Sequence, residues 1–325
     1  MNKKFDLYPL KFKPILKEKV WGGDKLYHLF GKSQLKNTGE SWELSGVENN
    51  ISLVANGSLQ GISLGKIIET YKAELLGDRV YRKFGDKFPL LFKFIDANQD
   101  LSVQLHPDDL LAKERHNSFG KTEMWYVMHA EKNARLILGF NKEMDERAYL
   151  KMLRENKLTD ILQSVLVKEG DSFFIEPGTV HAIGAGIVLA EIQQTSDITY
   201  RIYDWDRPDI DGNYRELHTD QALKAINFNH TNSRLIYSKE QNKAVKLCST
   251  PYFETNQLVL TNWLERDYSM LDSFVVYMCV EGELVVKTAH FSETIKKGET
   301  ILIPSSIKKI NLLTDSATIL EVYIP

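Results

Sequence analysis

The sequence predicts a mainly β fold, with two β-barrel domains and a few helices. Many short apolar runs follow one another at turn spacing, and helical periodicity is confined to a few segments. The 325 residues, 43% of them hydrophobic, supply enough apolar surface for one large core or two ordinary ones. We therefore expect a first domain over residues 1–235 and a second, almost wholly strand-like domain over residues 236–325.

Charge and cysteine content exclude several classes of protein. The 41 basic and 44 acidic residues are mixed along the chain and leave a formal charge of −3, so we expect no nucleic-acid or acidic-membrane partner. The lysine-rich N-terminus lacks a signal-peptide core, and no later stretch is apolar enough to cross a bilayer. Cys248 and Cys279 lie in apolar surroundings, which favours buried thiols in a reducing compartment. These features predict a cytoplasmic protein, and they do not predict its oligomeric state.

Three segments have helical spacing. Residues 63–76 predict one amphipathic helix, with Ser63 as its cap and Gly77 as its stop. Residues 145–166 predict a helix with a restart near residue 159, and residues 219–226 predict a short capped helix. We expect the helices to form an insertion or a cover over the strands.

Two strand patterns bring polar side chains to one face. Leu101–His106 alternates apolar and polar residues, so Gln104 and His106 share a face while the leucines and Val103 point the other way. The next pattern, residues 121–127, places Lys121 and Glu123 together in the same manner. An amide, an imidazole, an ammonium and a carboxylate are therefore expected to meet in one pocket.

A second histidine follows a tight turn. Gly170–Asp171 reads as a turn, Ser172–Ile175 as a strand, and Glu176–Gly178 as a turn that places His181 at the start of another strand. The next strand, residues 187–193, places Glu191 on the same side as its neighbour at 193.

The C-terminal part repeats this pattern. The stretch Gly298–Pro304 resembles Gly170–Pro177, and Lys308 stands where the first copy has His181. We infer two related barrels, of which only the first carries metal ligands.

Gln104, His106, Glu123 and His181 form a mixed nitrogen and oxygen donor set. Such a set suits one zinc ion per chain with a position left for water or substrate, whereas a closed structural zinc site more often uses cysteines. The alternative is that the histidines are ordinary core or surface residues, which is common for a single histidine.

Motifs along nearly the whole chain resemble one family. They are VWGG (20–23), GESWELS (39–45), FPLLFKFIDA (88–97), QLHPDD (104–109), KTE (121–123), EPGTVH (176–181) and EIQQTSDITYR (191–201). In this order they resemble the class I mannose-6-phosphate isomerases (phosphomannose isomerases) in their short bacterial form.

This resemblance implies two cupin-type, jelly-roll barrels and a zinc-dependent isomerase that interconverts mannose 6-phosphate and fructose 6-phosphate. It places the four predicted ligands at the family's ligand positions, Arg201 at its active-site arginine and Glu191 at an active-site carboxylate. Two departures stand out. The segment between Glu123 and His181 is shorter than in the long enzymes, so the resemblance does not predict whether this chain has the family's helical lid. The stretch QTSDITYR differs from the family's usual sequence, so the resemblance does not predict all of the substrate contacts.

Aldose–ketose isomerisation moves a proton between C1 and C2 while an enediolate oxygen is stabilised, a task that suits a cation beside the carbonyl. Glu191 is the candidate proton-transfer group, provided that partial burial moves its pKa toward neutrality. The alternative is a carboxylate merely paired with Arg201 or Lys121, because ion pairs also fill such pockets.

A sugar phosphate needs fixed positive charge and hydrogen-bond donors. Lys93, Ser102, Lys121 and Arg201 are the candidate substrate-binding residues, with Lys121 and Arg201 also catalytic candidates. Lys93 is the lone charge in an apolar run and should point to a polar cavity. Its alternative is a lysine that extends to solvent at a strand edge.

Two other functions stay open. A different metal-dependent cupin enzyme, such as an oxygenase, would need a redox-active metal and has no use for this cluster of cationic residues. A non-catalytic sugar-phosphate-binding cupin protein would not require an open metal position beside a carboxylate base.

Overall fold

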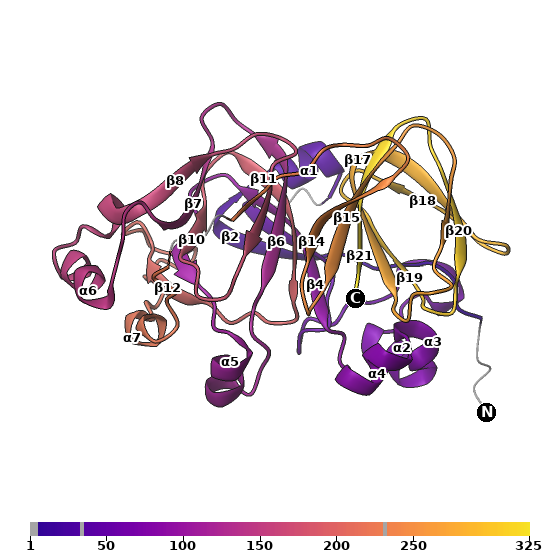
Figure 1. The fold of residues 1–325 in the computed structure, drawn as a ribbon, viewed down its shortest axis with the longest axis horizontal. Helices are drawn as coiled ribbons and strands as arrows, with labels where there is room; N and C mark the ends of the chain where they lie inside the picture. Colours follow the sequence, from indigo (N-terminus) through magenta and orange to yellow (C-terminus); the bar gives the residue numbers. More distant parts are fainter. Residues whose placement is uncertain (1–5, 33–35, 230–232) are drawn as a thin grey trace. The chain divides into compact units, whose positions relative to one another are not determined.

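The computed structural model describes residues 6–32, 36–229 and 233–325, and the chain divides into two compact units (Figure 1). The central unit comprises residues 16–41 and 93–235, and the C-terminal unit combines residues 1–15, 42–92 and 236–325. The sequence had placed residues 1–15 and 42–92 in the first domain. The first stretch groups with the C-terminal strands because strand β1 (Leu10–Lys11) pairs with β19 (Thr300–Ile303). The second does so through hydrogen bonds such as that from Asn56 Nδ2 to Glu293 Oε2.

Two sheets build the central unit. The strands are β2 (Ile15–Gly23), β3 (Thr38–Leu44), β4 (Leu90–Ala97), β5 (Val103–Leu105), β6 (Glu123–Ala130), β7 (Arg135–Phe140), β8 (Leu162–Leu166), β9 (Ser172–Ile175), β10 (His181–Ile183), β11 (Ile187–Gln194), β12 (Tyr200–Tyr203) and β13 (Arg234–Leu235). One sheet has the order β13-β9-β6-β11-β4-β3-β2 and the other the order β12-β5-β10-β7-β8. Strands distant in sequence therefore become neighbours, as in the predicted barrel.

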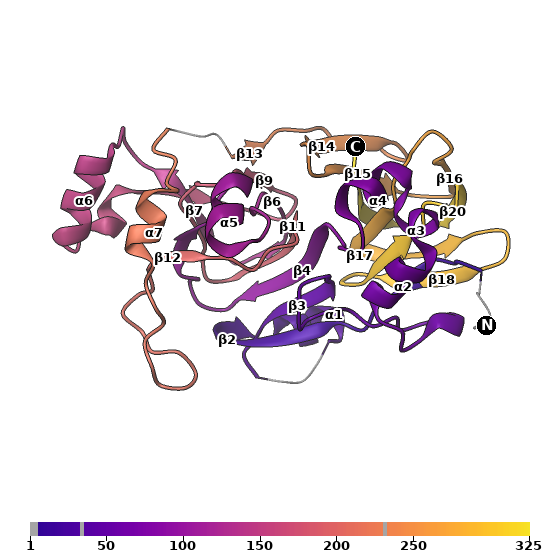
Figure 2. The ribbon, with the colours of Figure 1, turned by 90° about the horizontal axis from the view of Figure 1, so that it is seen from below.

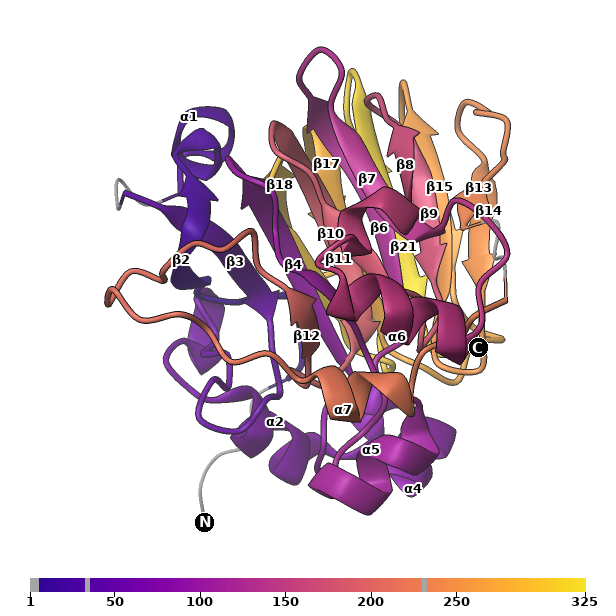
Figure 3. The ribbon, with the colours of Figure 1, turned by 90° about the vertical axis from the view of Figure 1, so that its left-hand side faces the viewer.

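Apolar side chains cover both faces of the five-stranded sheet. One cluster joins Trp125 and Leu189 of the seven-stranded sheet to Leu136 and Ile183 of the five-stranded sheet, so it lies between the sheets. The opposite face packs against helices (Figure 3). The helices of this unit are α1 (Lys25–Phe30), α5 (Asp109–His116), α6 (Glu146–Arg154), α7 (Thr219–Leu223) and the 3-10 helix η2 (Leu158–Ile161). The helical segments thus cover this sheet, because it has apolar residues on both faces.

The alternation predicted for residues 101–106 is confirmed in its central part. Val103 and Leu105 join the helix-side cluster, whereas the His106 ring lies near His181 and Glu123. Leu101 departs from the pattern and packs in the cluster between the sheets, because it precedes β5. The alternation therefore directs apolar side chains to the helices and polar ones between the sheets.

Two helix predictions need correction. Residues 63–76 form two helices, α2 (Leu64–Tyr71) and α3 (Ala73–Leu76), because Lys72 adopts a positive φ of 49° between them. Ser63 caps α2 as predicted, by accepting a hydrogen bond from the Lys66 amide. In the 145–166 segment the last five residues form β8, since they pair with β7.

Within residues 6–32, 36–229 and 233–325, no helix combines the length and apolar character needed to cross a bilayer.

The C-terminal unit is built on one nine-stranded sheet that curls around an apolar core. Its further strands are β14 (Ala244–Ser249), β15 (Glu254–Leu260), β16 (Leu264–Asp267), β17 (Val275–Lys287), β18 (Ser292–Lys296), β20 (Lys309–Leu313) and β21 (Ala317–Tyr323), and its further helices are α4 (Asp78–Phe84) and the 3-10 helix η1 (Gly57–Leu59). Figure 2 shows α2, α3 and α4 beside these strands. The Ser305 amide donates to the Leu75 carbonyl, and the Phe274 amide donates to the Leu76 carbonyl. These bonds attach the helices to the strands of the same unit.

The predicted repeat has a counterpart in the backbone. In the central unit the Gly170 amide donates to the Val127 carbonyl, and the Val127 amide donates to the Asp171 carbonyl. In the C-terminal unit, residues 298, 279 and 299 form the same two bonds in the same directions. Gly170 and Gly298 have φ values of 85° and 83°, which glycine adopts without strain. The two stretches therefore form the same turn in two barrels.

The two thiols make alkaline stability a test of the C-terminal core. Burial raises the pKa of Cys248 and of Cys279 from 9.0 to about 12. Unfolded thiols lose protons near pH 9 while the folded ones keep them, so their stabilising contribution is complete below pH 9 and is lost as the pH rises toward 12. Between pH 9 and 10 we expect the free energy of unfolding to fall, by at most about 1.4 kcal/mol per pH unit for each thiol.

Urea unfolding of the wild type and of the Cys248→Ala/Cys279→Ala double variant, at several pH values from 8 to 10, measures this contribution. The double variant should show a flatter pH dependence. Identical slopes would contradict the assignment.

Candidate metal centre

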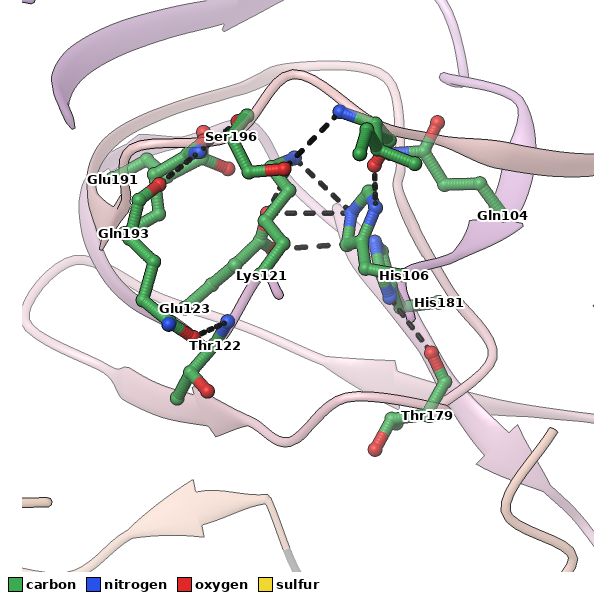
Figure 4. A network of polar contacts seen from close by, with 12 residues as sticks. Gln104, His106, Lys121, Thr122, Glu123, Thr179, His181, Glu191, Gln193 and Ser196 are labelled. Atoms are coloured by element: carbon green, nitrogen blue, oxygen red, sulfur yellow. Dashed lines mark hydrogen bonds and ion pairs between the residues drawn. The ribbon is translucent and has the colours of Figure 1, made fainter. Parts of the chain in front are cut away.

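Three strands bring two imidazoles and a carboxylate to one point between the sheets. His106 follows β5, His181 begins β10 and Glu123 begins β6, and each is 1% exposed. Figure 4 shows the three side chains pointing toward one another. Their ligand atoms all lie within 4.8 Å of one another, a spacing that one metal ion can bridge. The structure therefore brings together three of the four predicted ligands.

Backbone carbonyls orient both imidazoles. His106 Nδ1 lies 2.8 Å from the Ile198 carbonyl oxygen, and His181 Nδ1 lies 2.9 Å from the Thr179 carbonyl oxygen. A carbonyl oxygen only accepts, so each Nδ1 carries the proton and each Nε2 presents a lone pair. Burial lowers the pKa of His106 to about 4, with the Lys121 ammonium as the next cause, and burial also lowers the pKa of His181. Both rings are thus neutral and of the tautomer that binds a metal through Nε2.

Lys121 supplies the positive charge next to this group. Its ammonium lies 2.7 Å from Glu123 Oε1 and 3.1 Å from His106 Nε2. Burial acts to raise the pKa of Glu123, but the Lys121 ammonium outweighs burial and holds the pKa well below its usual range. Glu123 is therefore a buried, ionised carboxylate that depends on neighbouring positive charge.

The unsatisfied atoms of the group fit a metal ion. Both Glu123 oxygens and His181 Nε2 are buried and have no hydrogen-bond partner among the described residues, although Lys121 forms an ion pair with Oε1. Buried polar atoms normally have partners, so atoms without them indicate a ligand. Two imidazole nitrogens and a carboxylate suit zinc and related divalent ions, with further positions left open.

Gln104 lies beside the cluster in a second chain of contacts. Strand β5 lies between β10 and β12, and Gln104 on β5 pairs with His181 of β10 and with Arg201 of β12. Its amide oxygen accepts a hydrogen bond from Ser102 Oγ at 3.1 Å, and Ser102 Oγ accepts one from Arg201 Nε at 3.3 Å. The structure therefore joins Gln104, Ser102 and Arg201, three of the predicted site residues, along one edge of the group.

Glu191 pairs with Lys93. Lys93 Nζ lies 2.7 Å from Glu191 Oε1, and Trp125 Nε1 donates to Glu191 Oε2 at 3.0 Å. The sequence had offered Arg201 or Lys121 as its partner, and both were wrong. Strand β4, which carries Lys93, is the neighbour of β11 in the seven-stranded sheet, whereas Arg201 lies on β12 of the other sheet.

Lys93 does not extend to solvent at a strand edge, so that alternative was wrong. The residue is 6% exposed, and its ammonium also donates to Gln193 Oε1 at 2.7 Å. Burial acts to lower the pKa of Lys93, but the Glu191 carboxylate outweighs burial and the pKa is raised. Its polar surroundings, which the sequence predicted, are thus made by Glu191 and Gln193.

Sequence reasoning missed the residues that hold the group in place. The carbonyls of Thr179 and Ile198 left no signal, because every residue has a carbonyl. The alternation of strand 187–193 had placed Gln193 with Glu191, which was the available signal for its contact with Lys93. No sequence signal predicted the contact between Trp125 and Glu191, since most tryptophans are ordinary core residues.

Family models match two stretches of the chain. Residues 9–122 match the model described as phosphomannose isomerase type I, catalytic domain, and residues 243–324 match the mannose-6-phosphate isomerase cupin domain. These matches agree with the predicted mainly β, two-barrel fold.

Curated relatives and solved structures extend the similarity to nearly the full length. The chain is 36% identical over 308 residues to the mannose-6-phosphate isomerase ManA of Bacillus subtilis, covering 94% of this chain and 95% of that protein. It is 33% identical to the Streptococcus mutans mannose-6-phosphate isomerase, covering 92% and 93%. The crystal structure of a Bacillus subtilis mannose 6-phosphate isomerase matches with a TM-score of 0.88 and 30% identity, covering 97% of this chain and 99% of that one. A variant of the Salmonella typhimurium phosphomannose isomerase, 18% identical, shares the fold with a TM-score of 0.77, covering 97% and 99%.

The Lys121→Met variant tests the charge balance of the cluster. Without the ammonium, the buried Glu123 carboxylate loses its closest positive charge, so we expect the metal-free variant to lose roughly 3 to 5 kcal/mol of stability. A divalent metal ion replaces that charge, so it should stabilise Lys121→Met more than it stabilises the wild type. Thermal unfolding with and without zinc measures both effects.

The control is Lys113→Met, because Lys113 is an exposed lysine on α5. Equal stabilisation of all three proteins by zinc would contradict the charge balance described here.

Proposed function

The chain belongs to the type I phosphomannose isomerase family, and we propose that it interconverts mannose 6-phosphate and fructose 6-phosphate. The observation that carries the proposal is the buried cluster of two neutral imidazoles and an ionised carboxylate, with the Lys121 ammonium in contact with it. A cation site next to fixed positive charge suits an anionic sugar with a carbonyl to be polarised.

We further propose that one Zn²⁺ per chain is the cofactor, held by His106, Glu123 and His181 with Gln104 as fourth ligand. The neutral Nε2 atoms and the unsatisfied Glu123 oxygens support the first three ligands. Gln104 is supported only by the register, which places it opposite His181, and its oxygen would have to leave its contact with Ser102 to bind the ion. When bound, the metal supplies Lewis-acid stabilisation of the enediolate oxygen.

Glu191 is the proposed proton-transfer group. It would take the proton from C2 of the aldose and return it to C1 to give the ketose, and the reverse reaction uses the same carboxylate. The Lys93 ammonium contacts one oxygen of this carboxylate, and the Trp125 N–H donates to the other, so both oxygens have fixed positions. The transfer therefore needs Glu191 Oε1 to exchange its contact with the ammonium for the substrate proton.

Lys93, Ser102, Lys121 and Arg201 are proposed to bind the sugar phosphate. Arg201 is held from two sides, since its Nε donates to Ser102 Oγ and its NH1 donates to the Glu216 carbonyl at 2.9 Å. A guanidinium fixed in this way offers a preoriented donor to a phosphate or an enediolate oxygen. Lys121, beside Glu123, adds a second positive charge next to the metal position and is proposed to act with Arg201 in catalysis.

The buried, unpaired thiols of Cys248 and Cys279 support a reducing environment, and we propose the cytoplasm as its location.

A coupled assay tests reaction class and cofactor together. Fructose 6-phosphate formed from mannose 6-phosphate is measured on the purified protein, after chelation, and after zinc is restored. We expect activity to disappear with the chelator and to return with zinc, because the two imidazoles and the carboxylate need the ion to act. Full activity after complete metal removal would refute the cofactor. A protein that carries stoichiometric metal but leaves mannose 6-phosphate unchanged would refute the substrate.

The Arg201→Ala variant separates substrate chemistry from metal binding. We expect turnover to fall by about a hundredfold or more, as for loss of a preoriented donor, while bound zinc stays near one per chain. The matched variants His106→Ala and His181→Ala should lose tight zinc binding and turnover together. Elemental analysis and steady-state kinetics on the same preparations provide both measurements. Loss of zinc from Arg201→Ala as well would assign Arg201 a structural role.

A further inference from the structure

Gln193 connects two parts of the site that the proposed mechanism treats separately. It lies on β11, is fully buried, and makes hydrogen bonds at both ends of its amide. Its oxygen accepts from Lys93 Nζ at 2.7 Å, and its nitrogen donates to the carbonyls of Gln194 and Ser196 at 2.9 and 2.6 Å. A buried amide with three bonds to two different segments is a rigid link between them.

The segment that Gln193 holds is the turn of residues 194–198. Within it the Ser196 amide donates to the Gln194 carbonyl, and the Ile198 amide donates to Ser196 Oγ. The Ile198 carbonyl at its end accepts the His106 Nδ1 proton. The position of this turn therefore decides whether His106 presents Nε2 to the cluster.

The chemistry of the neighbours fixes the orientation of the Gln193 amide. Lys93 offers only donors, and the two backbone carbonyls offer only acceptors. Only one of the two amide orientations satisfies all three contacts. Methionine has a similar length but cannot make any of them, and glutamate can make only the contact with Lys93.

We propose that Gln193 is a positioning residue, which ties the Lys93 ammonium to the 194–198 turn and thereby holds His106 in its metal-binding tautomer. It touches neither the cluster atoms nor, in the proposed mechanism, the reacting atoms of the sugar. The inference rests on the proposed metal site, and its test includes a measurement that needs no metal.

The first measurement is the ¹⁵N NMR spectrum of His106 in the metal-free protein. In the wild type we expect one protonated nitrogen, Nδ1, and one unprotonated nitrogen, Nε2. In Gln193→Met the two nitrogens should shift toward each other as the tautomers mix, because the turn no longer fixes the acceptor carbonyl. An unchanged His106 spectrum in Gln193→Met would overturn the proposal.

The second measurement is zinc affinity, by competition with a chromophoric chelator. Loss of a group that orients a metal ligand typically weakens metal affinity about tenfold to a hundredfold, and we expect this for Gln193→Met. Gln193→Glu keeps the contact with Lys93 but turns a carboxylate oxygen toward two carbonyls, so it should weaken zinc binding as well. Wild-type affinity in Gln193→Glu would overturn the role of the turn, and this variant provides the test should Gln193→Met fail to fold.

The control is Ile192→Val, which trims a fully buried neighbour that alternation points to the opposite side of β11. It should lose stability without changing the His106 spectrum or the zinc affinity. An equal loss of affinity in this control would show that general destabilisation, and not positioning, is the cause. If the wild type binds no zinc, the proposed function fails, whereas the NMR comparison still decides the role of Gln193.

Discussion

The buried charge of Glu123 is the constraint on which the site depends. A carboxylate with 1% exposure is expensive to ionise unless opposite charge and hydrogen-bond donors surround it. Lys121 supplies the charge at 2.7 Å, and the two neutral imidazoles bring nitrogen lone pairs that add no compensating charge. The arrangement is therefore well suited to exchange an ammonium contact for a metal ion. A purely structural ion pair would leave fewer atoms unsatisfied.

The interior of the central unit separates packing from chemistry. Between its two sheets, Leu136, Ile183 and Leu189 form an apolar core, while the polar residues gather around Glu123. The five-stranded sheet needs helices on its other face because Val103 and its neighbours are apolar there. The site thus lies on short strands that are packed on both sides, and this packing limits the motion of the ligands.

Alternation in strands was enough to predict which residues share a face, as His106 shows, because the period of two follows from backbone geometry alone. It was not enough to predict pairing between strands. Glu191 meets Lys93 because β4 and β11 are neighbours, and the order of strands in a sheet is set by the whole fold. Local patterns also overestimated helices: Lys72 breaks one, and residues 162–166 pair as a strand, since tertiary contacts override weak propensity. Backbone acceptors such as the Ile198 carbonyl have no sequence signature at all.

The second barrel shows what the first would be without an open site. In the register, Glu321 stands opposite Tyr277 as Glu191 stands opposite Trp125, so both barrels bury a carboxylate at the same position. Arg266 contacts both oxygens of Glu321 at 2.9 Å, and Tyr268 and Asn256 complete its hydrogen bonds.

The two barrels differ at the position of Glu123. Glu123 pairs with Ile175 in the first barrel, and Val275 pairs with Ile303 at the equivalent position of the second. In the second barrel the buried carboxylate of Glu321 therefore makes its hydrogen bonds within the barrel. The first barrel has an additional carboxylate, whose oxygens still need a partner. That difference, more than the shared fold, is what makes one of them a site for chemistry.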